Sequence, residues 1–229
     1  MLRTSEVFHS IQGEGVYQGI PTVFIRLQGC NLPGTTGGCL YCDTSYAWDP
    51  TKGKDMAIEE IIQEVSKLAS SYGSWCCITG GEPLWQEDEL EELVRKLKKG
   101  GYKVTIETNG SFNPPRWYTL VDSWSADIKC PSSGVCGVSK EDWFHTRGSD
   151  QIKMVVGNTE DLEFVKGMLD KYRASSPIVL LSPISGILVN KGEYWNKEWL
   201  REVWEFCCEN KVRFSLQIHK ILFGDKRGV

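Results

Sequence analysis

Short apolar runs that alternate with amphipathic stretches constrain the fold of this chain most strongly. Helical spacing is clear at 56–68, where positions 58, 61, 62, 65 and 68 are apolar. Runs with the β-branched and aromatic content of strands lie at 22–28, 75–79, 102–107, 123–129, 152–156, 177–181 and 212–218. Strands that alternate with helices form largely parallel sheets. Six or seven strands are too few for a closed eight-stranded barrel. We therefore predict an α/β fold, an incomplete TIM-like barrel in a single domain over residues 1–229.

Three cysteines follow the first of these predicted strands. Cys30, Cys39 and Cys42 have the spacing C-x8-C-x2-C, and a proline and glycines keep the intervening loop irregular. Loops at the carboxyl ends of parallel strands build active sites. A structural zinc ion takes four closed ligands, whereas three thiolates on a four-iron cluster leave one iron open. From spacing alone, an iron–sulfur cluster, a zinc site and unliganded thiols all remain possible.

A glycine-rich segment, Thr79-Gly-Gly-Glu-Pro83, follows the strand at 75–79. Consecutive glycines allow close approach of a ligand, exposed amides there can face a carboxylate, and Glu82 could accept from an ammonium group. An ordinary β-to-α turn explains most such glycine pairs. Together with the three-cysteine loop, however, the segment resembles the radical S-adenosylmethionine (SAM) superfamily. In that superfamily the triad binds a 4Fe-4S cluster and the Gly-Gly-Glu-Pro segment holds the methionyl amino group of SAM.

Two charged residues have alternative interpretations. Arg26 interrupts an apolar strand, where a buried charge is costly unless paired. It is either a structural ion pair or a contact for an anion such as a substrate carboxylate. Glu14 lies between two glycines and is either a solvated turn residue or a carboxylate presented to a ligand.

Several motifs make the resemblance more specific, because they occur in the order found in 7-carboxy-7-deazaguanine synthases. The likeness runs from about residue 5 to the end of the chain. The motifs are Ser10-Ile-Gln-Gly-Glu-Gly15, Phe24-Ile-Arg-Leu-Gln-Gly-Cys30, Cys42-Asp-Thr44, Thr79–Pro83, Glu107-Thr-Asn-Gly110, Ser182-Pro-Ile-Ser185, Gln217-Ile-His-Lys220 and Gly224–Val229. The resemblance implies the incomplete barrel of radical SAM enzymes. It also implies a lyase that contracts the ring of 6-carboxy-5,6,7,8-tetrahydropterin to 7-carboxy-7-deazaguanine, releases ammonia and regenerates SAM. Such a product serves queuosine and archaeosine biosynthesis.

The resemblance also assigns roles to residues of this chain. It implies that the cofactor carries the radical chemistry, so no side chain is given a catalytic role. The cluster ligands would be Cys30, Cys39 and Cys42, and the Mg²⁺ ligand would be Thr44. Cofactor contacts would come from Asp43, Gly81, Glu82, Glu107 and Asp127. Substrate contacts would come from Gln12, Glu14, Arg26, Thr79, His219 and Val229. Lys129 and Lys153 fall on the same rim, where we expect paired structural lysines.

Charge and cysteine content bear on partners and compartment. A net charge of −4 and a pI of about 5.5 disfavour direct nucleic-acid binding. Nine cysteines with no apolar signal or membrane-spanning stretch fit the reducing cytoplasm. The resemblance implies an electron donor such as flavodoxin or ferredoxin. We expect Trp195, Trp199 and Trp204 to pack, in part at a homodimer contact.

Two other classes of protein remain open at this stage. A glycyl-radical activase would share the cluster and SAM but act on a protein, which suits Glu14, Arg26 and His219 less well than a small anionic heterocycle does. A non-catalytic zinc- or cluster-binding module would hold one metal tightly and cleave no cofactor.

Overall fold

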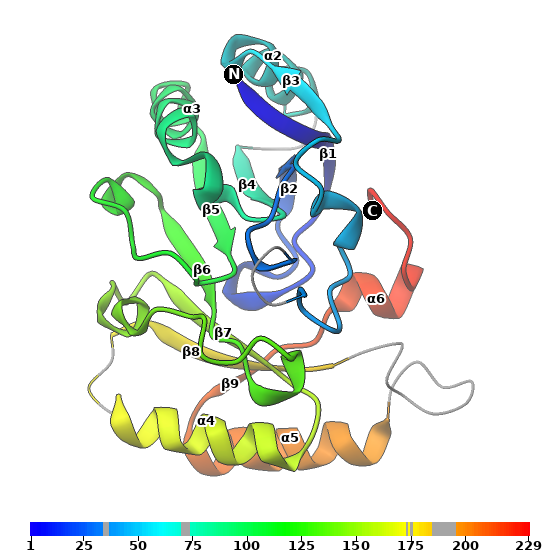
Figure 1. The fold of residues 1–229 in the computed structure, drawn as a ribbon, viewed down its shortest axis with the longest axis vertical. Coiled ribbons are helices and arrows are strands. Elements are labelled where there is room, and N and C mark those ends of the chain that lie inside the picture. Colours follow the sequence, from blue (N-terminus) through cyan, green and yellow to red (C-terminus); the bar gives the residue numbers. More distant parts are fainter. Residues whose placement is uncertain (34–36, 70–73, 173, 175, 185–195) are drawn as a thin grey trace.

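The described part of the chain forms one nine-stranded sheet in the order β3-β1-β2-β4-β5-β6-β7-β8-β9. This computed structural model describes residues 1–33, 37–69, 74–172, 174, 176–184 and 196–229. The strands are β1 (Leu2–Ile11), β2 (Pro21–Leu27), β3 (Lys54–Met56), β4 (Trp75–Gly80), β5 (Lys103–Thr108), β6 (Ser123–Asp127), β7 (Gln151–Val156), β8 (Ile178–Pro183) and β9 (Arg213–Phe214). From β2 to β9 every neighbouring pair of strands is parallel. At the edge of the sheet, β1 pairs antiparallel with both β2 and β3. The sheet curves but does not close, so the expected α/β incomplete barrel is confirmed (Figure 1).

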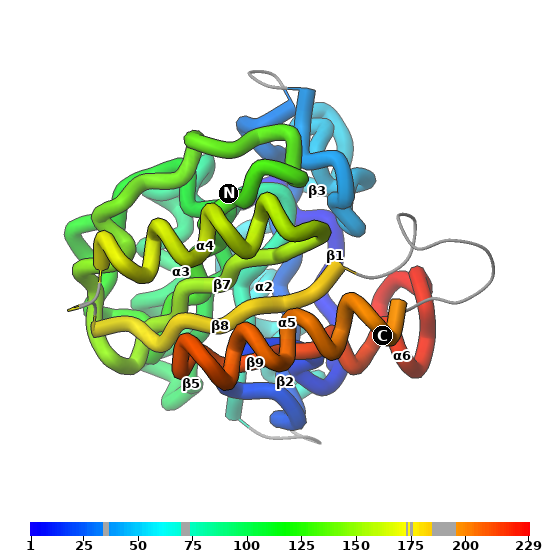
Figure 2. The backbone as a smooth tube through the Cα atoms, turned by 90° about the horizontal axis from the view of Figure 1, so that it is seen from below, coloured from blue at the N-terminus to red at the C-terminus, as the bar shows by residue number. Residues whose placement is uncertain are grey.

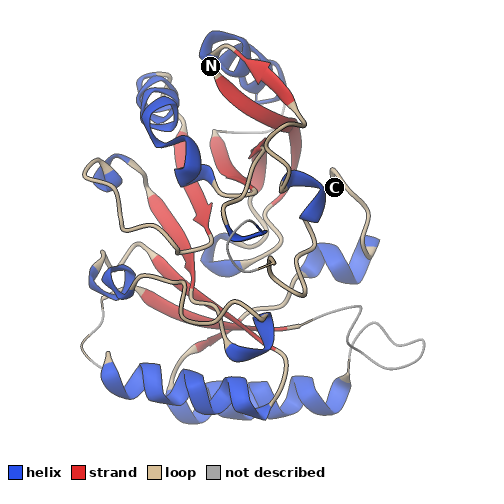
Figure 3. Ribbon diagram, viewed as in Figure 1, coloured by secondary structure: helices blue, strands red, loops and turns tan. Residues whose placement is uncertain are grey.

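Amphipathic helices cover the outside of this curved sheet (Figure 3). They are α2 (Ile58–Ala69), α3 (Glu87–Lys99), α4 (Thr159–Lys171) and α5 (Lys197–Asn210), while the shorter α6 (Ile218–Phe223) lies apart near the C-terminus. In Figure 2, α4 and α5 lie side by side along β7 and β8. Short 3-10 helices in the connections span Gly15–Tyr17, Ser45–Ala47, Pro83–Gln86, Tyr118–Leu120, Pro131–Ser133 and Glu141–His145.

Side chains alternate along the parallel strands, so one face of the sheet packs in the hydrophobic core and the other, concave face carries polar side chains. In β2, Val23, Ile25 and Leu27 are buried in the main core beneath the helices, so Phe24 and Arg26 point to the concave face. The register continues this pattern across the sheet, because Arg26 pairs with Thr79 and Asp127 pairs with Lys153. Polar residues at the carboxyl ends of the strands therefore gather on the inner face.

The strand count exceeds the six or seven that we expected, because β1 and β3 form an antiparallel edge. The β1 strand carries charged and hydroxyl side chains, and a bulge between Thr4 and Glu6 interrupts its register. Its sequence therefore lacks the apolar run that marks the other strands.

The last predicted strand, 212–218, is also shorter than expected. Only Arg213 and Phe214 pair with β8, and Ser215 N–H still bonds to Leu181 C=O at 2.8 Å. The chain then turns, because Ile218 N–H bonds to the carbonyl of Gly13 at 3.1 Å instead of to β8. This turn carries the segment that precedes α6 into the concave face.

Candidate active site

A cavity of about 250 Å³ lies on the concave face, where the strand ends, the cysteine loop and the C-terminal tail meet. A concave site with convergent polar groups is the usual form of a small-molecule site. All of the sequence-predicted site residues except Glu82 line this cavity: Gln12, Glu14, Arg26, Cys30, Cys39, Cys42, Asp43, Thr44, Thr79, Gly81, Glu107, Asp127, His219 and Val229.

The three cysteines of the loop after β2 share one wall of the cavity. Cys30 and Cys39 are buried and pack with Leu32 and Val135. Trp48 Nε1 donates to Cys42 Sγ at 3.2 Å. Hydrogen bonds to the sulfurs are among the features that tune iron–sulfur clusters. Burial raises the pKa of the Cys30 thiol to about 11 and also raises that of Cys39, so a bound metal is needed to hold them as thiolates.

The number of thiols in the loop suits a cluster better than a closed zinc site. A structural zinc ion takes four closed ligands, whereas three thiolates on a four-iron cluster leave one iron open. A 4Fe-4S cluster is therefore the group that Cys30, Cys39 and Cys42 would hold, and all three line the cavity.

The glycines after β4 are required by tight packing of the backbone. A Cβ on Gly80 would lie 2.2 Å from Leu27 O, and one on Gly81 would lie 2.1 Å from Gly29 O. Gly81 N–H donates to Leu27 O, and Glu82 N–H donates to Gly29 O. Those two amides are thus engaged within the protein and do not face a ligand carboxylate, contrary to one of our expectations.

Unlike the other predicted site residues, Glu82 does not line the cavity. Its side chain is fully buried. The carboxylate accepts from Leu84 N–H at 2.9 Å, Thr108 Oγ1–H at 2.8 Å and Asn109 N–H at 2.6 Å. The oxygens face these donors because they satisfy the turn after β4 and the end of β5. Glu82 thus fixes the loop geometry and does not face a ligand.

Glu107 is held at the cavity by residues from β4 and from the segment that follows β1. Thr79 Oγ1 donates to its Oε2 at 2.9 Å, and Gln12 Nε2 donates to its Oε1 at 3.0 Å. The Gln12 side chain also accepts from Glu14 N–H at 3.2 Å. Gln12 therefore lines the cavity while both ends of its amide hold other site residues in place.

Two carboxylates and two lysines form a buried ionic network on β6, β7 and the Gln12–Gly15 segment. Lys153 Nζ donates to Glu14 Oε2 at 2.9 Å and lies 3.8 Å from Asp127 Oδ1, while Lys129 Nζ donates to Asp127 Oδ2 at 2.7 Å. The second oxygen of Glu14 accepts from Gln217 Nε2 at 2.8 Å. Burial alone would raise the pKa of Glu14, but Lys153 and the other neighbours lower it to about 2.

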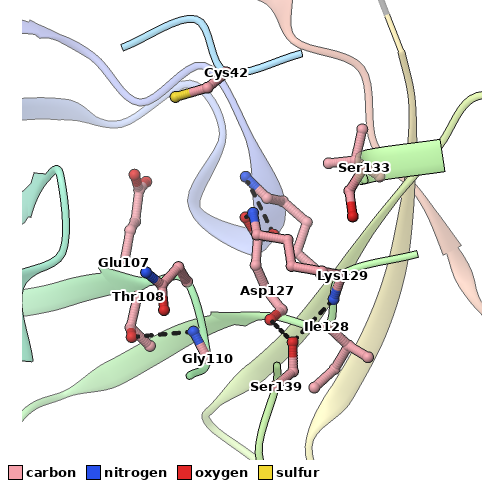
Figure 4. Close-up of polar contacts among 12 residues, drawn as sticks. Cys42, Glu107, Thr108, Gly110, Asp127, Ile128, Lys129, Ser133 and Ser139 are labelled. Carbon is pink, nitrogen blue, oxygen red and sulfur yellow. Dashed lines mark hydrogen bonds and ion pairs between the residues drawn. The ribbon is translucent and has the colours of Figure 1, made fainter. Parts of the chain in front are cut away.

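Asp127 and Lys129 are held by their own backbone surroundings as well. Ser139 Oγ–H donates to the carbonyl of Asp127, and Lys129 N–H donates to the same hydroxyl oxygen (Figure 4). The Cys42 side chain lies across the space from this pair in the same view. The Asp127 side chain is thus fixed at the wall of the cavity, opposite the cysteine loop.

Arg26 is paired within the protein and also reaches the cavity. It lines the cavity and its Nε–H also donates to Glu6 Oε1 at 2.8 Å. Tyr46 OH donates to the same oxygen at 3.0 Å. The pairing holds the guanidinium at the cavity wall.

The C-terminal segment closes one side of the cavity. Arg227 lies over the Tyr46 ring at 4.0 Å and pairs with Glu6 Oε2 at 3.1 Å. Lys220 on α6 bridges Asp43 and Asp225 at 3.3 and 3.0 Å. These contacts bring His219 and Val229 to the cavity and set Asp43, beside the cysteine loop, against α6.

Lys153, Gln217 and Lys220 belong to the site, although our sequence-based assignment did not include them. We expected Lys153 to be a paired structural lysine, and it is paired, but with Glu14. Gln217 and Lys220 stand on either side of His219 in one motif. Their position beside His219 in this motif could have identified both as site residues.

Comparison with known proteins decides the family. Residues 25–127 match the radical SAM superfamily. The 7-carboxy-7-deazaguanine synthase of Pyrobaculum aerophilum is 35% identical, over 99% of this chain and 97% of the relative. That of Koribacter versatilis is 34% identical over 97% of each. This chain belongs to the 7-carboxy-7-deazaguanine synthase family. It is a radical SAM enzyme, and its family implies a 4Fe-4S cluster and SAM.

Solved structures agree with this assignment. The crystal structure of QueE from Escherichia coli superposes with a TM-score of 0.71 at 26% identity, covering 94% of this chain and 93% of that one. A radical SAM methyltransferase from Sphaerobacter thermophilus, 13% identical with a TM-score of 0.60, shares the fold. Across the described residues no helix is long and apolar enough to cross a membrane.

Proposed function

We propose that this enzyme converts 6-carboxy-5,6,7,8-tetrahydropterin to 7-carboxy-7-deazaguanine with release of ammonia, for deazapurine nucleosides such as queuosine or archaeosine. One observation carries the proposal: the cavity lined by the three cysteines also presents a partly buried carboxylate, Glu14, and a guanidinium, Arg26. A pterin that bears a carboxylate offers N–H donors at one end and an anion at the other. The two charges of the cavity therefore complement the two ends of this substrate.

Glu14 is suited to the N–H groups of the pterin. A carboxylate has about four lone-pair sites, and the contacts from Lys153 and Gln217 use one on each oxygen. One site on each oxygen is left for the two parallel N–H groups of the pterin. Arg26 would pair with the substrate carboxylate, since only its Nε–H is used by Glu6 and a guanidinium carries four more N–H donors.

The remaining predicted residues would complete the two ligand sites. His219 and Thr79 would hydrogen-bond the substrate ring, with the Val229 carboxylate at the tail side and Gln12 behind Glu107. Gly81, Glu107, Asp43 and Asp127 would surround SAM. The Glu82 carboxylate already accepts three hydrogen bonds within the protein, so the backbone carbonyls of Gly80 and Gly81, which line the cavity, are the groups that would accept from its amino group.

The cluster and SAM, when bound, supply the hydrogen-atom abstraction and its return. The protein holds the substrate against water and fixes its orientation. We also propose Mg²⁺ at Thr44, because a hard cation prefers oxygen ligands and the Thr44 hydroxyl lines the cavity beside Cys42. In this arrangement the ion would join the substrate carboxylate to the protein.

The wider setting is proposed on the same basis. We propose a single domain over residues 1–229, a cytoplasmic homodimer, and a flavodoxin or ferredoxin as electron donor. Trp204 on α5 is more than half exposed and is suited to a contact between subunits. Trp199 instead packs against the core and bonds to Val156 O at 3.2 Å. Trp195 lies outside the described residues.

Anaerobic turnover after iron and sulfide reconstitution tests the activity. The assay contains 6-carboxytetrahydropterin, SAM, Mg²⁺ and dithionite, and product is followed by mass and ultraviolet absorbance. We expect 7-carboxy-7-deazaguanine with SAM conserved. SAM cleavage without this product would refute the proposed substrate, and tightly bound zinc with no iron would refute the cluster.

A matched pair of cysteine variants controls this experiment. Cys42→Ala should lose cluster iron and all turnover. Cys208→Ala, which removes an exposed thiol on α5 outside the cavity, should retain both. Equal loss in the two variants would show that thiol removal itself, and not the cavity triad, is responsible.

A further inference from the structure

Lys153 lies between the proposed substrate site and the proposed SAM site of the cavity. It lies in β7, and only 16% of its side chain is exposed. Its ammonium contacts Glu14 on the proposed substrate side and faces Asp127 on the proposed cofactor side, at 2.9 and 3.8 Å. A buried ammonium at this place costs desolvation energy that its partners must offset.

The charge balance shows which of the two acids depends on Lys153. Asp127 already has Lys129 at 2.7 Å, so it keeps a cation without Lys153. Among the described residues, Lys153 is the only lysine or arginine that forms an ion pair with Glu14. Its removal would thus leave a partly buried carboxylate with Gln217 as a neutral donor.

We infer that Lys153 is a positioning residue: it holds Glu14 as an oriented anion toward the substrate and couples it to the Asp127–Lys129 pair on the cofactor side. This inference rests on the proposed function of Glu14. With one lone-pair site of Oε2 bound to Lys153 and one of Oε1 bound to Gln217, the carboxylate plane is set from two elements, β7 and the segment before α6. Rotation of the carboxylate away from the substrate would break both bonds.

A purely structural lysine would behave differently. If Lys153 served only to neutralise buried acids, its loss would lower stability without a specific effect through Glu14. If it acts through Glu14, the two substitutions must fail to add in substrate binding, because removal of the carboxylate removes the group that Lys153 orients.

The surroundings of Glu14 also imply a pH signature. The groups that face it are Lys153 from β7, with His219 and Gln217 from the C-terminal segment. Behind Lys153 stand Asp127 and Glu107, two acids that keep it protonated. Without Lys153, burial should raise the pKa of Glu14 from its low value, so binding should weaken as pH falls.

Equilibrium binding to the reconstituted enzyme tests the inference without turnover. The 6-carboxytetrahydropterin is titrated anaerobically into holoenzyme with SAM and Mg²⁺ but no reductant, from pH 5.5 to 8.5. We expect Lys153→Met to weaken binding roughly 10- to 100-fold, the scale of a hydrogen bond to a charged group, and more at low pH. Lys153→Arg should recover most of the affinity. Lys171→Met, which breaks an exposed pair with Glu141, should match the wild type.

The decisive comparison is between Glu14→Gln and the double variant Glu14→Gln with Lys153→Met. Equal affinity of the two supports the inference, and a further loss in the double variant overturns it. This comparison holds even if Lys153→Met alone fails to fold, because the double variant removes both charges of the pair. Wild-type affinity in Lys153→Met would also overturn the inference. Wild-type protein that does not bind the pterin would instead refute the proposed function.

Discussion

The Nε–H of Arg26 donates to Glu6 Oε1 over 2.8 Å, so an arginine of β2 is held at the cavity by a carboxylate of β1. The opposite oxygen of Glu6 accepts from Arg227 in the C-terminal tail at 3.1 Å. One carboxylate thus connects the cavity wall to the tail that covers it. Glu6 belongs to β1, in the antiparallel edge of the sheet that no apolar run in the sequence indicates. This edge therefore supplies the carboxylate that holds Arg26 at the cavity.

Arg26→Ala should lower kcat/KM severely while the cluster remains intact. The guanidinium is the group that we assign to the substrate carboxylate, and truncation of a buried charge pair costs 2–5 kcal/mol, or on the order of 10²-fold in kcat/KM. Iron and sulfide content should be unchanged, because the hydrogen bond of the Arg26 side chain goes to Glu6 of β1 and not to a cysteine. Arg26→Lys keeps the charge but not the planar fork and should be intermediate. Full activity of Arg26→Ala would remove the residue from the site.

Arg227→Ala should raise KM for the pterin several-fold and leave the thermal stability nearly unchanged. The side chain is half exposed, and exposed ion pairs contribute little to folding. Its contacts with Glu6 and Tyr46 hold the tail over the cavity, so the effect should fall on substrate affinity. Arg95→Ala, which breaks an exposed pair on α3, is the control for both readouts. A fall in Tm with unchanged KM would contradict the role of the tail.

Gly13→Ala should impair substrate binding through His219. A Cβ at Gly13 would lie 2.3 Å from His219 Nδ1, so the imidazole must move. Displacement of a positioning group by about 1 Å can cost roughly 10²-fold in rate. We expect that scale of loss in kcat/KM, with SAM binding retained. Gly167→Ala places a Cβ in open space on α4 and should have full activity. Wild-type kinetics in Gly13→Ala would show that His219 needs no fixed position.

Glu82→Gln should change how stability depends on pH. Burial raises the pKa of Glu82 to about 7, although three donors limit the rise. A raised pKa contributes stability that is fully present below the unfolded value of about 4.5 and is lost as pH rises through 7. Across this window the free energy of unfolding of the wild type should fall by roughly 3 kcal/mol relative to the variant.

Urea unfolding of metal-free protein at several values of pH from 4.5 to 8 measures this difference. The control is Glu64→Gln, at an exposed position. Its free energy of unfolding should differ from that of the wild type by the same amount at every pH. A constant gap between the wild type and Glu82→Gln would mean that Glu82 keeps its charge throughout this range.

The family, the fold class and most of the cavity wall could be predicted from the sequence because their signals are local. Short apolar runs rich in β-branched and aromatic residues mark β2 and the parallel strands after it, as expected for the strands of a parallel sheet that helices cover. The first cysteine of the triad and the segment after β4 each lie within a few residues of a strand end. Parallel strands bring such ends together at one rim, so proximity in space followed from proximity to a strand end.

Tertiary structure alone decided how the charges are partnered. Glu82 comes just after β4 and Glu107 lies near the end of β5. Three donors nevertheless hold the Glu82 carboxylate in the core, while Thr79 and Gln12 hold that of Glu107 at the cavity. Lys153 and Glu14 are 139 residues apart and meet only because β7 and the turn after β1 face the same space. The sequence gives the type of each side chain, but its ion-pair or hydrogen-bond partner depends on the register and curvature of the whole sheet. The sequence by itself therefore determined the chemistry available to this protein, and the fold decided which residues face the ligand and which hold them there.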